Sequence, residues 1–159
     1  MAAGAIEVFE AFKTTQMSGV AGAAVGVGVI DLAGGDLRLM LTRVAGLPVA
    51  ASDAVMSDGV IGANEVSGSG YPAGGISTGV TISVVTQANL TRVKCLDVVI
   101  DQDGAGPTDI RHWVLYEYSG TPANDKLVCW GDFGADKSIQ TGSLTIDFEN
   151  TNGGTLFEY

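Results

Sequence analysis

This chain is poor in charged residues, and the few that it has are mostly acidic. Lys and Arg together number 8 among 159 residues, against 18 Asp and Glu, which gives a formal net charge of −10. A surface of that sign repels the phosphates of nucleic acids and the headgroups of anionic membranes. We therefore expect neither a nucleic-acid partner nor a membrane partner.

Cysteine and histidine are also scarce, which limits the metal sites and nucleophilic sites that the chain can build. Cys95 and Cys129 fall inside predicted strands and are interpreted as small buried apolar residues, with a disulfide between neighbouring strands as the alternative. No Cys/His cluster has the spacing of a zinc site. His112 is the single histidine, and no nucleophile elbow accompanies it, so we expect a structural or interfacial role.

A long hydrophobic run is missing as well. The stretch Thr14–Ile30 carries no charge, but repeated glycines make it too weakly apolar to span a bilayer. Glu7 and Glu10 precede it, where a secretory signal would carry basic residues. We expect a protein that is made and used without a signal peptide.

What the chain does have is glycine and apolar side chains. Its 23 glycines, and the 46% of its residues that are hydrophobic, are typical of a β-rich domain with many turns and argue against disorder. A chain of 159 residues forms one domain, or one domain and an arm. Such a chain buries about two thirds of its unfolded surface, so it needs neither a metal nor a disulfide to fold.

The stretch Ile110–Phe148 contains the clearest strands and both tryptophans. We predict a meander of three strands joined by short turns, over Ile110–Tyr118, Lys126–Gly134 and Ser143–Phe148. The first two have apolar residues on both faces, so we expect a second sheet or a partner chain to cover each side. The third alternates apolar with polar residues and should have a single wet face.

Further elements are expected outside this stretch. A short helix is predicted over Ala5–Lys13. The loop Ala45–Gly79 is rich in glycine and has little periodicity, with room for a short helix near Ser52–Met56 and a short strand near Asn64–Ser67. Four more strands are predicted, at Asp36–Val44, Val80–Thr86, Arg92–Ile100 and Thr155–Tyr159.

Seven or eight strands with at most one or two short helices predict an all-β fold. The repeated strand–turn spacing favours an antiparallel β-sandwich of jelly-roll-like arrangement. Residues 1–28 are expected to form an N-terminal arm, or a short helix plus a glycine-rich segment. Residues 29–159 are expected to form the β-sandwich domain.

Two acidic groups match metal-binding or catalytic arrangements only in part. The segment Asp101–Gly104 begins like a calcium loop, but its glycine comes too early, and Ala105 and His112 stand where ligands belong. We interpret it as a solvated turn. Paired carboxylates hydrolyse glycosides where two converge across a cleft, but nothing in the sequence indicates that the last strands bring theirs together. These carboxylates are Asp132, Asp136, Asp147 and Glu149.

The glycine-rich segments and the aromatic residues complete the candidate features. Gly19–Gly28 and Gly68–Gly79 lack the lysine and the strand–loop–helix context of a phosphate-binding loop, so they are interpreted as turns and arms. Aromatic rings gather on two adjacent strands, where exposed rings would form a sugar-stacking platform or a protein interface and buried rings would be core. They belong to Trp113, Tyr116, Tyr118, Trp130 and Phe133.

Four motifs in order resemble the small β-rich structural proteins encoded in the head modules of tailed bacteriophages and prophages. They are Ile30–Leu37 with the strand that follows, Asn64–Gly75, Trp113–Ala123, and Trp130–Ser138 closing with Gly142–Phe148. The resemblance covers most of the chain from Ile30 onward. The chain departs from the family at Ala33–Gly35, in Gly19–Gly28 and in Ala45–Gly62.

The resemblance implies a virion component with no catalytic activity, cofactor or metal. Its implied role is that of a capsid cement (decoration) protein, which binds the outer surface of the expanded head and staples neighbouring capsomers. It would assemble in the host cytoplasm, with the major capsid protein and further copies of itself, in a homotrimer, as partners. Strands that are apolar on both faces, such as Ile110–Tyr118, would supply the trimer surface.

The residues also leave a second hypothesis from another class. A phage tail-fibre or receptor-binding module would stack host glycans on an exposed Trp130 or Tyr118. An enzyme of the hydrolase type would need a recognisable site, and the sequence has none, so we expect no enzymatic activity.

Overall fold

The computed structural model describes residues 6–9, 12, 36–43, 53–58, 61–77, 82–87, 90–95, 97–148 and 155–158. These residues form strands, turns and a short 3-10 helix, η1 (Gly62–Asn64), and contain no helix of seven residues or more. The strand pairings among them are antiparallel. The predicted all-β fold is confirmed, and the jelly-roll arrangement stays a prediction.

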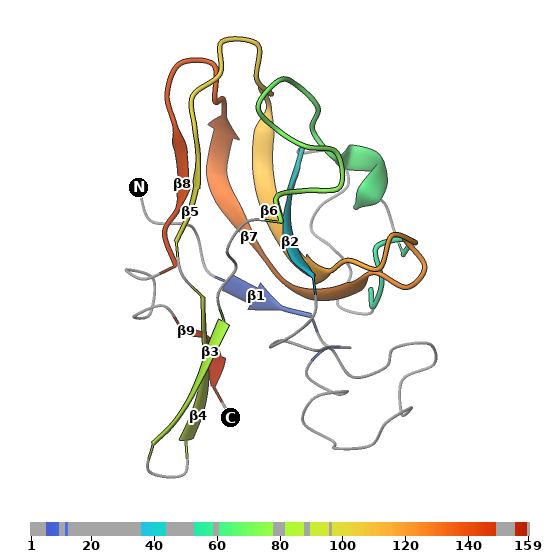
Figure 1. Ribbon diagram of the computed structural model, residues 1–159, viewed down its shortest axis with the longest axis vertical. Coiled ribbons are helices and arrows are strands. Elements are labelled where there is room, and N and C mark those ends of the chain that lie inside the picture. The colour runs from blue at the N-terminus through green and yellow to red at the C-terminus, as the bar shows by residue number, and fades with distance from the viewer. Residues whose placement is uncertain are drawn as a thin grey trace.

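The largest sheet has four strands in the order β1-β7-β6-β2. These strands are β1 (Ile6–Val8), β7 (Lys126–Lys137), β6 (Ile110–Glu117) and β2 (Leu37–Thr42). Figure 1 shows the long, curved β7 beside β6, with β2 on the far side of β6. The hairpin between β6 and β7 turns at Gly120, whose φ of 82° lies in the left-handed region that favours glycine.

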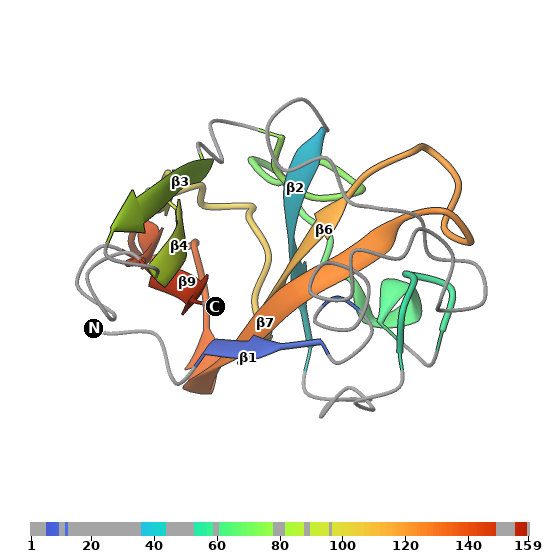
Figure 2. The same cartoon turned by 90° about the horizontal axis from the view of Figure 1, so that it is seen from below.

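Two smaller sheets complete the described fold. One contains β3 (Ile82–Gln87), β4 (Leu90–Cys95) and β9 (Thr155–Glu158), and the other contains β5 (Val98–Ile100) and β8 (Leu144–Ile146). Figure 1 shows β5 and β8 running along one side of the four-stranded sheet, and Figure 2 shows the β3-β4-β9 group to one side of the long strands. A two-stranded sheet is marginal by itself, so β5 and β8 depend on packing against the large sheet.

Strand β6 lies at the centre of the core and is covered on both faces, as predicted. Phe148, just beyond β8, packs edge-on against Trp113 with the ring centroids 5.1 Å apart. On the other face, the hydroxyl of Tyr116 donates a hydrogen bond to the carbonyl of Gly74 in the loop 64–76. Five residues of β6 are at most 1% exposed: Ile110, Trp113, Val114, Leu115 and Tyr116.

This burial corrects the prediction that β6 supplies the surface of a trimer. The apolar side chains of the strand are buried within a single chain, so they have no free area with which to contact a second copy. The apolar residues on both faces of β6 indicate that both faces are buried. A second sheet and a loop of the same chain cover them. A homotrimer would have to form through other surfaces.

The pairing of the last strands also differs from the prediction. β8 pairs with β5 and not with β7, so the predicted three-stranded meander is wrong. The edge of β7 is already occupied by β1. The alternation of β8 is nevertheless as expected, since Leu144 and Ile146 are buried and Thr145 between them is exposed.

The predicted strand Arg92–Ile100 is in fact two strands, β4 and β5, which belong to different sheets. A break around Asp97 lets the chain pass from one sheet to the other. The strands predicted at Asp36–Val44, Val80–Thr86 and Thr155–Tyr159 are confirmed as β2, β3 and β9 with small shifts of their ends.

The short helix predicted over Ala5–Lys13 is wrong at Ile6–Val8, which forms β1 and pairs with β7. Phe9 and Phe12 are 2% and 1% exposed, so this segment contributes apolar side chains to the core. Spacing that suits a helix is overridden here by pairing with an open sheet edge.

Residues 53–56 contain no helix, contrary to the prediction near Ser52–Met56, because Val55 forms a β-bridge to Lys126. The strand predicted near Asn64–Ser67 is reduced to a bridge between Glu65 and Thr42. The glycine-rich segment Gly19–Gly28 lies outside the described residues.

The backbone of β7 comes very close to the Trp113 ring at Gly131. A Cβ atom on Gly131 would lie 2.6 Å from the Cε2 and Cζ2 atoms of Trp113, well inside van der Waals contact. The fully buried indole therefore requires a residue without a side chain on the neighbouring strand. A Cβ atom on Gly104, by contrast, would meet nothing within 4 Å.

We expect Gly131→Ala to lower the free energy of unfolding by about 1–3 kcal/mol, because it overpacks the core around Trp113. Gly104→Ala is the matched control and should change the free energy by less than about 0.5 kcal/mol. Urea unfolding followed by tryptophan fluorescence measures both variants. Equal stability of the two would contradict the tight packing of Gly131 on Trp113.

Candidate functional site

A single carboxylate oxygen holds the glycine-rich loop 64–76 in its shape. Oε1 of Glu65 accepts hydrogen bonds from the hydroxyl of Tyr71 at 3.0 Å and from the amides of Gly74 and Gly75 at 2.8 and 3.1 Å. The two glycines have φ angles of 81° and 78°, a conformation that side chains other than glycine rarely adopt. Glu65 thus fixes a turn that only this pair of residues forms without strain.

The loop is also joined to the edge strand β2. Leu39 and Ile76 exchange backbone hydrogen bonds of 3.0 and 2.9 Å. The hydroxyl of Tyr71 accepts a 3.0 Å hydrogen bond from the amide of Leu41, and burial raises the pKa of this tyrosine. Because β2 is the edge of the four-stranded sheet, the loop covers polar backbone groups that would otherwise be open to pairing.

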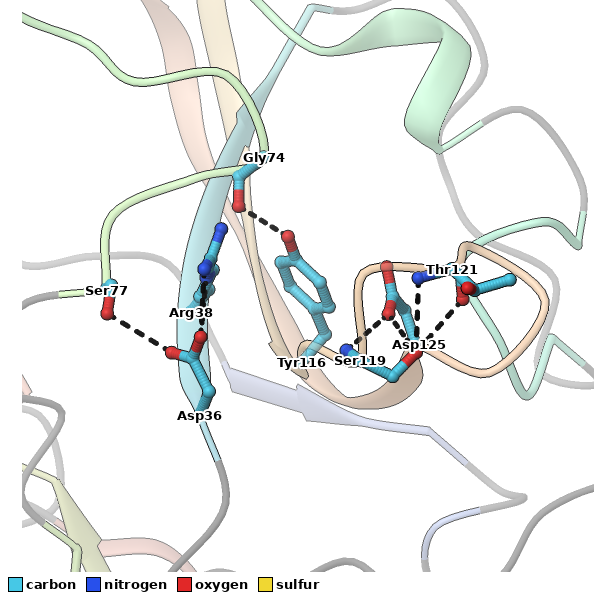
Figure 3. A network of polar contacts seen from close by, with 8 residues as sticks. All are labelled: Asp36, Arg38, Gly74, Ser77, Tyr116, Ser119, Thr121 and Asp125. Atoms are coloured by element: carbon cyan, nitrogen blue, oxygen red, sulfur yellow. Dashed lines mark hydrogen bonds and ion pairs between the residues drawn. The ribbon is translucent and has the colours of Figure 1, made fainter.

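A second loop is fixed in the same manner by Asp125, which is 3% exposed. Its Oδ1 accepts hydrogen bonds from the amide and the hydroxyl of Ser119, at 2.6 and 2.8 Å. Figure 3 shows Tyr116 between the two loops, with its hydroxyl directed to Gly74 and the Asp125 turn beside it.

Between the two loops lies an open cleft of about 470 Å³, which is the candidate functional site. This volume falls in the range of small-molecule and peptide sites. Its apolar lining comes from Met40, Met56 and Tyr116, which are 4%, 4% and 1% exposed, and from the partly buried ring of Tyr118. Its two charged lining residues are Glu65 and Asp125.

Arg38 lies against the ring of Tyr118, with its guanidinium carbon 3.4 Å from the ring centroid. The same guanidinium forms a 2.8 Å ion pair with Asp36, which also accepts a hydrogen bond from Ser77. The hydrogen bond from Arg38 lowers the pKa of Asp36 and holds it ionised. The positive charge of Arg38 is thus already balanced beside the cleft (Figure 3).

In the acidic segment Asp101–Gly104, the carboxylate of Asp103 is bonded within the chain. The carboxylate of Asp103 accepts hydrogen bonds from the amide of Ala105 and the hydroxyl of Ser69, at 2.9 and 2.7 Å, and these lower its pKa. Among the described residues, no three His, Cys, Asp or Glu side chains are grouped to hold a metal ion.

Two of the four carboxylates that were considered for glycoside hydrolysis lie beside the same arginine. Asp132 forms a 2.6 Å ion pair with Arg111, and Asp136 lies 3.8 Å from the same guanidinium. The hydrogen bond from Arg111 lowers the pKa of Asp132. Asp147 is half-buried, and Glu149 lies outside the described residues. Asp132 and Asp136 therefore share the positive charge of a single arginine.

His112 is 5% exposed and has a structural environment, as predicted. Its ring packs edge-on against Trp130 with centroids 5.8 Å apart, and its Nε2 lies 3.8 Å from Asp132. Burial lowers the pKa of His112 and favours the neutral imidazole.

The predicted aromatic cluster divides between the core and its margin. Trp113 and Tyr116 are buried, whereas Tyr118, Trp130 and Phe133 are partly buried at the margin of the core. Both cysteines are buried and neither forms a disulfide, which confirms the apolar interpretation. The sequence did not indicate Glu65 or Asp125 as functional candidates. For Glu65, the available signal in the sequence was the glycine pair Gly74 and Gly75 that follows it.

Glu65 is expected to stabilise the fold through Oε1 more than through its charge. Glu65→Ala leaves three donors without their acceptor and should lower the free energy of unfolding by about 2–3 kcal/mol. Glu65→Gln keeps an oxygen in the same place and should lower it by less than about 1 kcal/mol. Chemical denaturation measures the difference, and equal losses in the two variants would show that the three hydrogen bonds contribute little.

The lowered pKa of His112 makes stability depend on pH. The folded state binds this proton less readily than the unfolded state, so the stabilisation is complete above the ordinary pKa of 6.5 and is lost as pH falls through it. We expect the free energy of unfolding to decline between about pH 7.5 and about pH 5, and to decline less in His112→Gln. The lowered pKa values of Asp36, Asp103 and Asp132 change the free energy of unfolding only below the ordinary pKa of 3.8, outside this pH range. Identical pH profiles for the two proteins would contradict this assignment.

Comparison of the chain with protein-family models, with curated proteins and with solved structures finds no match. In the described part of the chain, no helix has the length and apolar character needed to cross a membrane.

Proposed function

We propose that the chain is a bacteriophage capsid cement (decoration) protein, which binds the outer surface of the expanded head and staples neighbouring capsomers. The proposal is supported by the motifs that resemble phage head-module proteins. Three of them, Asn64–Gly75, Trp113–Ala123 and Trp130–Ser138, lie wholly within the described residues. Their places in the fold can therefore be compared.

The observation that carries the proposal is that these motifs pack against one another in the fold. Tyr116 of the second motif donates its hydroxyl hydrogen bond to Gly74 of the first. The third motif belongs mostly to β7, which pairs with β6 along its length. Residues that are far apart in the chain are thus brought together, and the first two motifs contribute Glu65, Gly74 and Tyr116 to the lining of the cleft.

A surface of this kind suits a stapling role. Both loops are fixed by hydrogen bonds before a partner arrives, so binding orders few further groups and loses little conformational entropy. A protein that binds the expanded shell and not the unexpanded one stabilises the expanded form by mass action. In the proposed homotrimer, three weak contacts act together through their effective concentration.

One observation favours the second candidate, a tail-fibre or receptor-binding module that binds host glycans. Tyr118 is partly buried and lines the open cleft, where a sugar could meet its ring. However, Arg38 already stacks on that ring, and Trp130 packs against His112. Both rings offered for stacking are partly occupied by the chain itself, so we prefer the cement role.

The test is attachment to shells of the phage that encodes the chain. We expect the purified protein to co-sediment with expanded shells that lack it and to remain in the supernatant with unexpanded shells. Electron cryomicroscopy of the decorated shells should place it on the outer surface at junctions between capsomers. Light scattering of the free protein measures the oligomer, for which we expect a trimer.

The same material separates the two candidates. A protein that ignores expanded shells but binds host glycans, with binding lost in Tyr118→Ala, would overturn the cement role in favour of the receptor-binding module. Density inside the shell or in the tail would also overturn it.

A further inference from the structure

Strand β5 has one edge that no described strand covers. In the described part of the chain, β5 pairs with β8 and with no other strand, so the two form a sheet of only two strands. The edge of a strand presents backbone amide and carbonyl groups that can pair with another extended chain. The loop 64–76 occupies the corresponding edge of the large sheet, at β2, whereas β5 keeps its second edge.

A groove of about 630 Å³ lies between β5 and residues 70–77, and we call it the β5 groove. It shares no lining residue with the cleft beside Tyr118. On the wall opposite β5, Ile76 exchanges backbone hydrogen bonds with Leu39, so that wall is extended backbone joined to the large sheet. Its apolar lining comes from Pro72, Ile76, Val99 and Ile100.

The side chain of Val99 marks the open face of β5. Val99 is 59% exposed, whereas Val98 and Ile100 on either side of it are each 4% exposed. No other large hydrophobic side chain among the described residues is exposed to this degree. An apolar side chain on an unpaired strand is a feature of edges that bind a further strand, in which the backbone provides affinity and alternate side chains provide specificity.

Charge at both ends of β5 defines which segment would fit. Asp97 and Asp101 each lie two residues from Val99, the spacing that places side chains on the same face of an extended chain. Asp101 is exposed and Asp97 is half-buried. A strand that pairs with β5 in antiparallel register about Val99 would place one residue opposite each carboxylate. Opposite charges favour such cross-strand pairs, so the complementary segment is basic, apolar and basic at every second residue.

The other charged residues of the groove are already paired within the chain. The guanidinium of Arg38 forms a 2.8 Å ion pair with Asp36, as Figure 3 shows. The carboxylate of Asp103 accepts hydrogen bonds from Ser69 and from the amide of Ala105. These pairs leave the charges beside β5 to select the segment that binds.

The same charges disfavour a second copy of this chain as the occupant. If β5 paired with β5 of another copy about Val99, Asp97 of each chain would lie opposite Asp101 of the other. Like charges directly opposite one another destabilise a strand pair. The net charge of −10 on each chain adds a repulsion between copies. A different protein is therefore the better occupant.

We propose that the β5 groove binds an extended segment of another protein, which adds to the free edge of β5 and places basic residues opposite Asp97 and Asp101. In the proposed cement role, that segment belongs to the shell. The identity of the partner rests on the proposed function, whereas addition of a strand to β5 can be tested without shells.

The direct test uses a blocked peptide of the order lysine, valine, valine, valine, lysine. Nuclear magnetic resonance of the isotope-labelled protein follows the backbone amide signals of Val99 and Ile100 during titration. We expect both signals to shift and to saturate in the millimolar range, typical of a short peptide that forms few contacts. Glutamate in place of both lysines should weaken binding at least about tenfold, because attraction at both ends becomes repulsion.

Two further peptides test whether the backbone pairs. Each carries N-methyl groups at alternate residues, one peptide in each of the two possible phases. The phase that removes the donors facing β5 should weaken binding at least about tenfold, because those hydrogen bonds cannot form. Unweakened binding of both methylated peptides would overturn the addition of a strand.

Three variants of the protein complete the test. Val99→Lys places a positive charge at the centre of the open face and should weaken the lysine peptide at least about tenfold. Asp101→Asn removes one cross-strand attraction and should weaken it about threefold. Glu7→Gln makes the same change in net charge on β1, at the opposite edge of the large sheet, and should bind like the parent protein. Chemical denaturation confirms that each variant is folded.

Several outcomes would overturn the proposal. They are equal binding of the lysine and glutamate peptides, no shift of the β5 amide signals, equal weakening by Glu7→Gln, or dimers of the free protein that Val99→Lys abolishes. Peptide binding by a protein that ignores shells would leave the β5 groove assigned and overturn the cement role. Shell binding that is unchanged in Val99→Lys would overturn the groove as the contact with the shell.

Discussion

The covering of β6 on both faces is the constraint on which the rest of this molecule depends. One face needs Phe148 and the bare backbone of Gly131 against Trp113. The other face needs the loop that receives the hydroxyl of Tyr116. A strand that is apolar on both sides would bind another chain if either cover were missing. The positions of β8, of β7 and of the loop 64–76 all follow from meeting this requirement within one chain.

The two loops beside the cleft use one chemical solution twice. Glu65 and Asp125 each direct one carboxylate oxygen to amides and hydroxyls of their own loop. A carboxylate suits this task because one of its oxygens accepts several hydrogen bonds. Both side chains also line the cleft. Stability of the loops and the character of the cleft therefore depend on the same two side chains.

The sequence predicted the class of fold and most strands because their information is local. Alternating residues identify β2 and β8, and apolar residues on both faces identify β6 as covered. Local sequence does not show which strand lies beside a given strand. An alternation with a period of two residues shows which face is buried, but not which strand pairs with it. That is why the pairing of β8 with β5 and the division of Arg92–Ile100 were not foreseen.

The candidate site was less predictable than the fold. Glu65 acts on Gly74 and Gly75, nine and ten residues later, and no periodic pattern joins positions at that distance. The aromatic residues were recognised, but whether each ring is core or surface is decided by segments that pack on it. Trp113 is fully buried and Tyr118 lines a cleft, although both come from the same short stretch of chain.

The burial of both cysteines makes it possible to measure how often the folded chain opens. Burial raises the pKa of Cys95 to about 12 and also raises that of Cys129, so neither is present as a thiolate at neutral pH. Alkylating reagents attack the thiolate and need access to the sulfur. In the folded chain, each sulfur is protonated and buried, so it does not react. The rate at which such a reagent modifies the two cysteines therefore records how often the strands around them separate, without any added label.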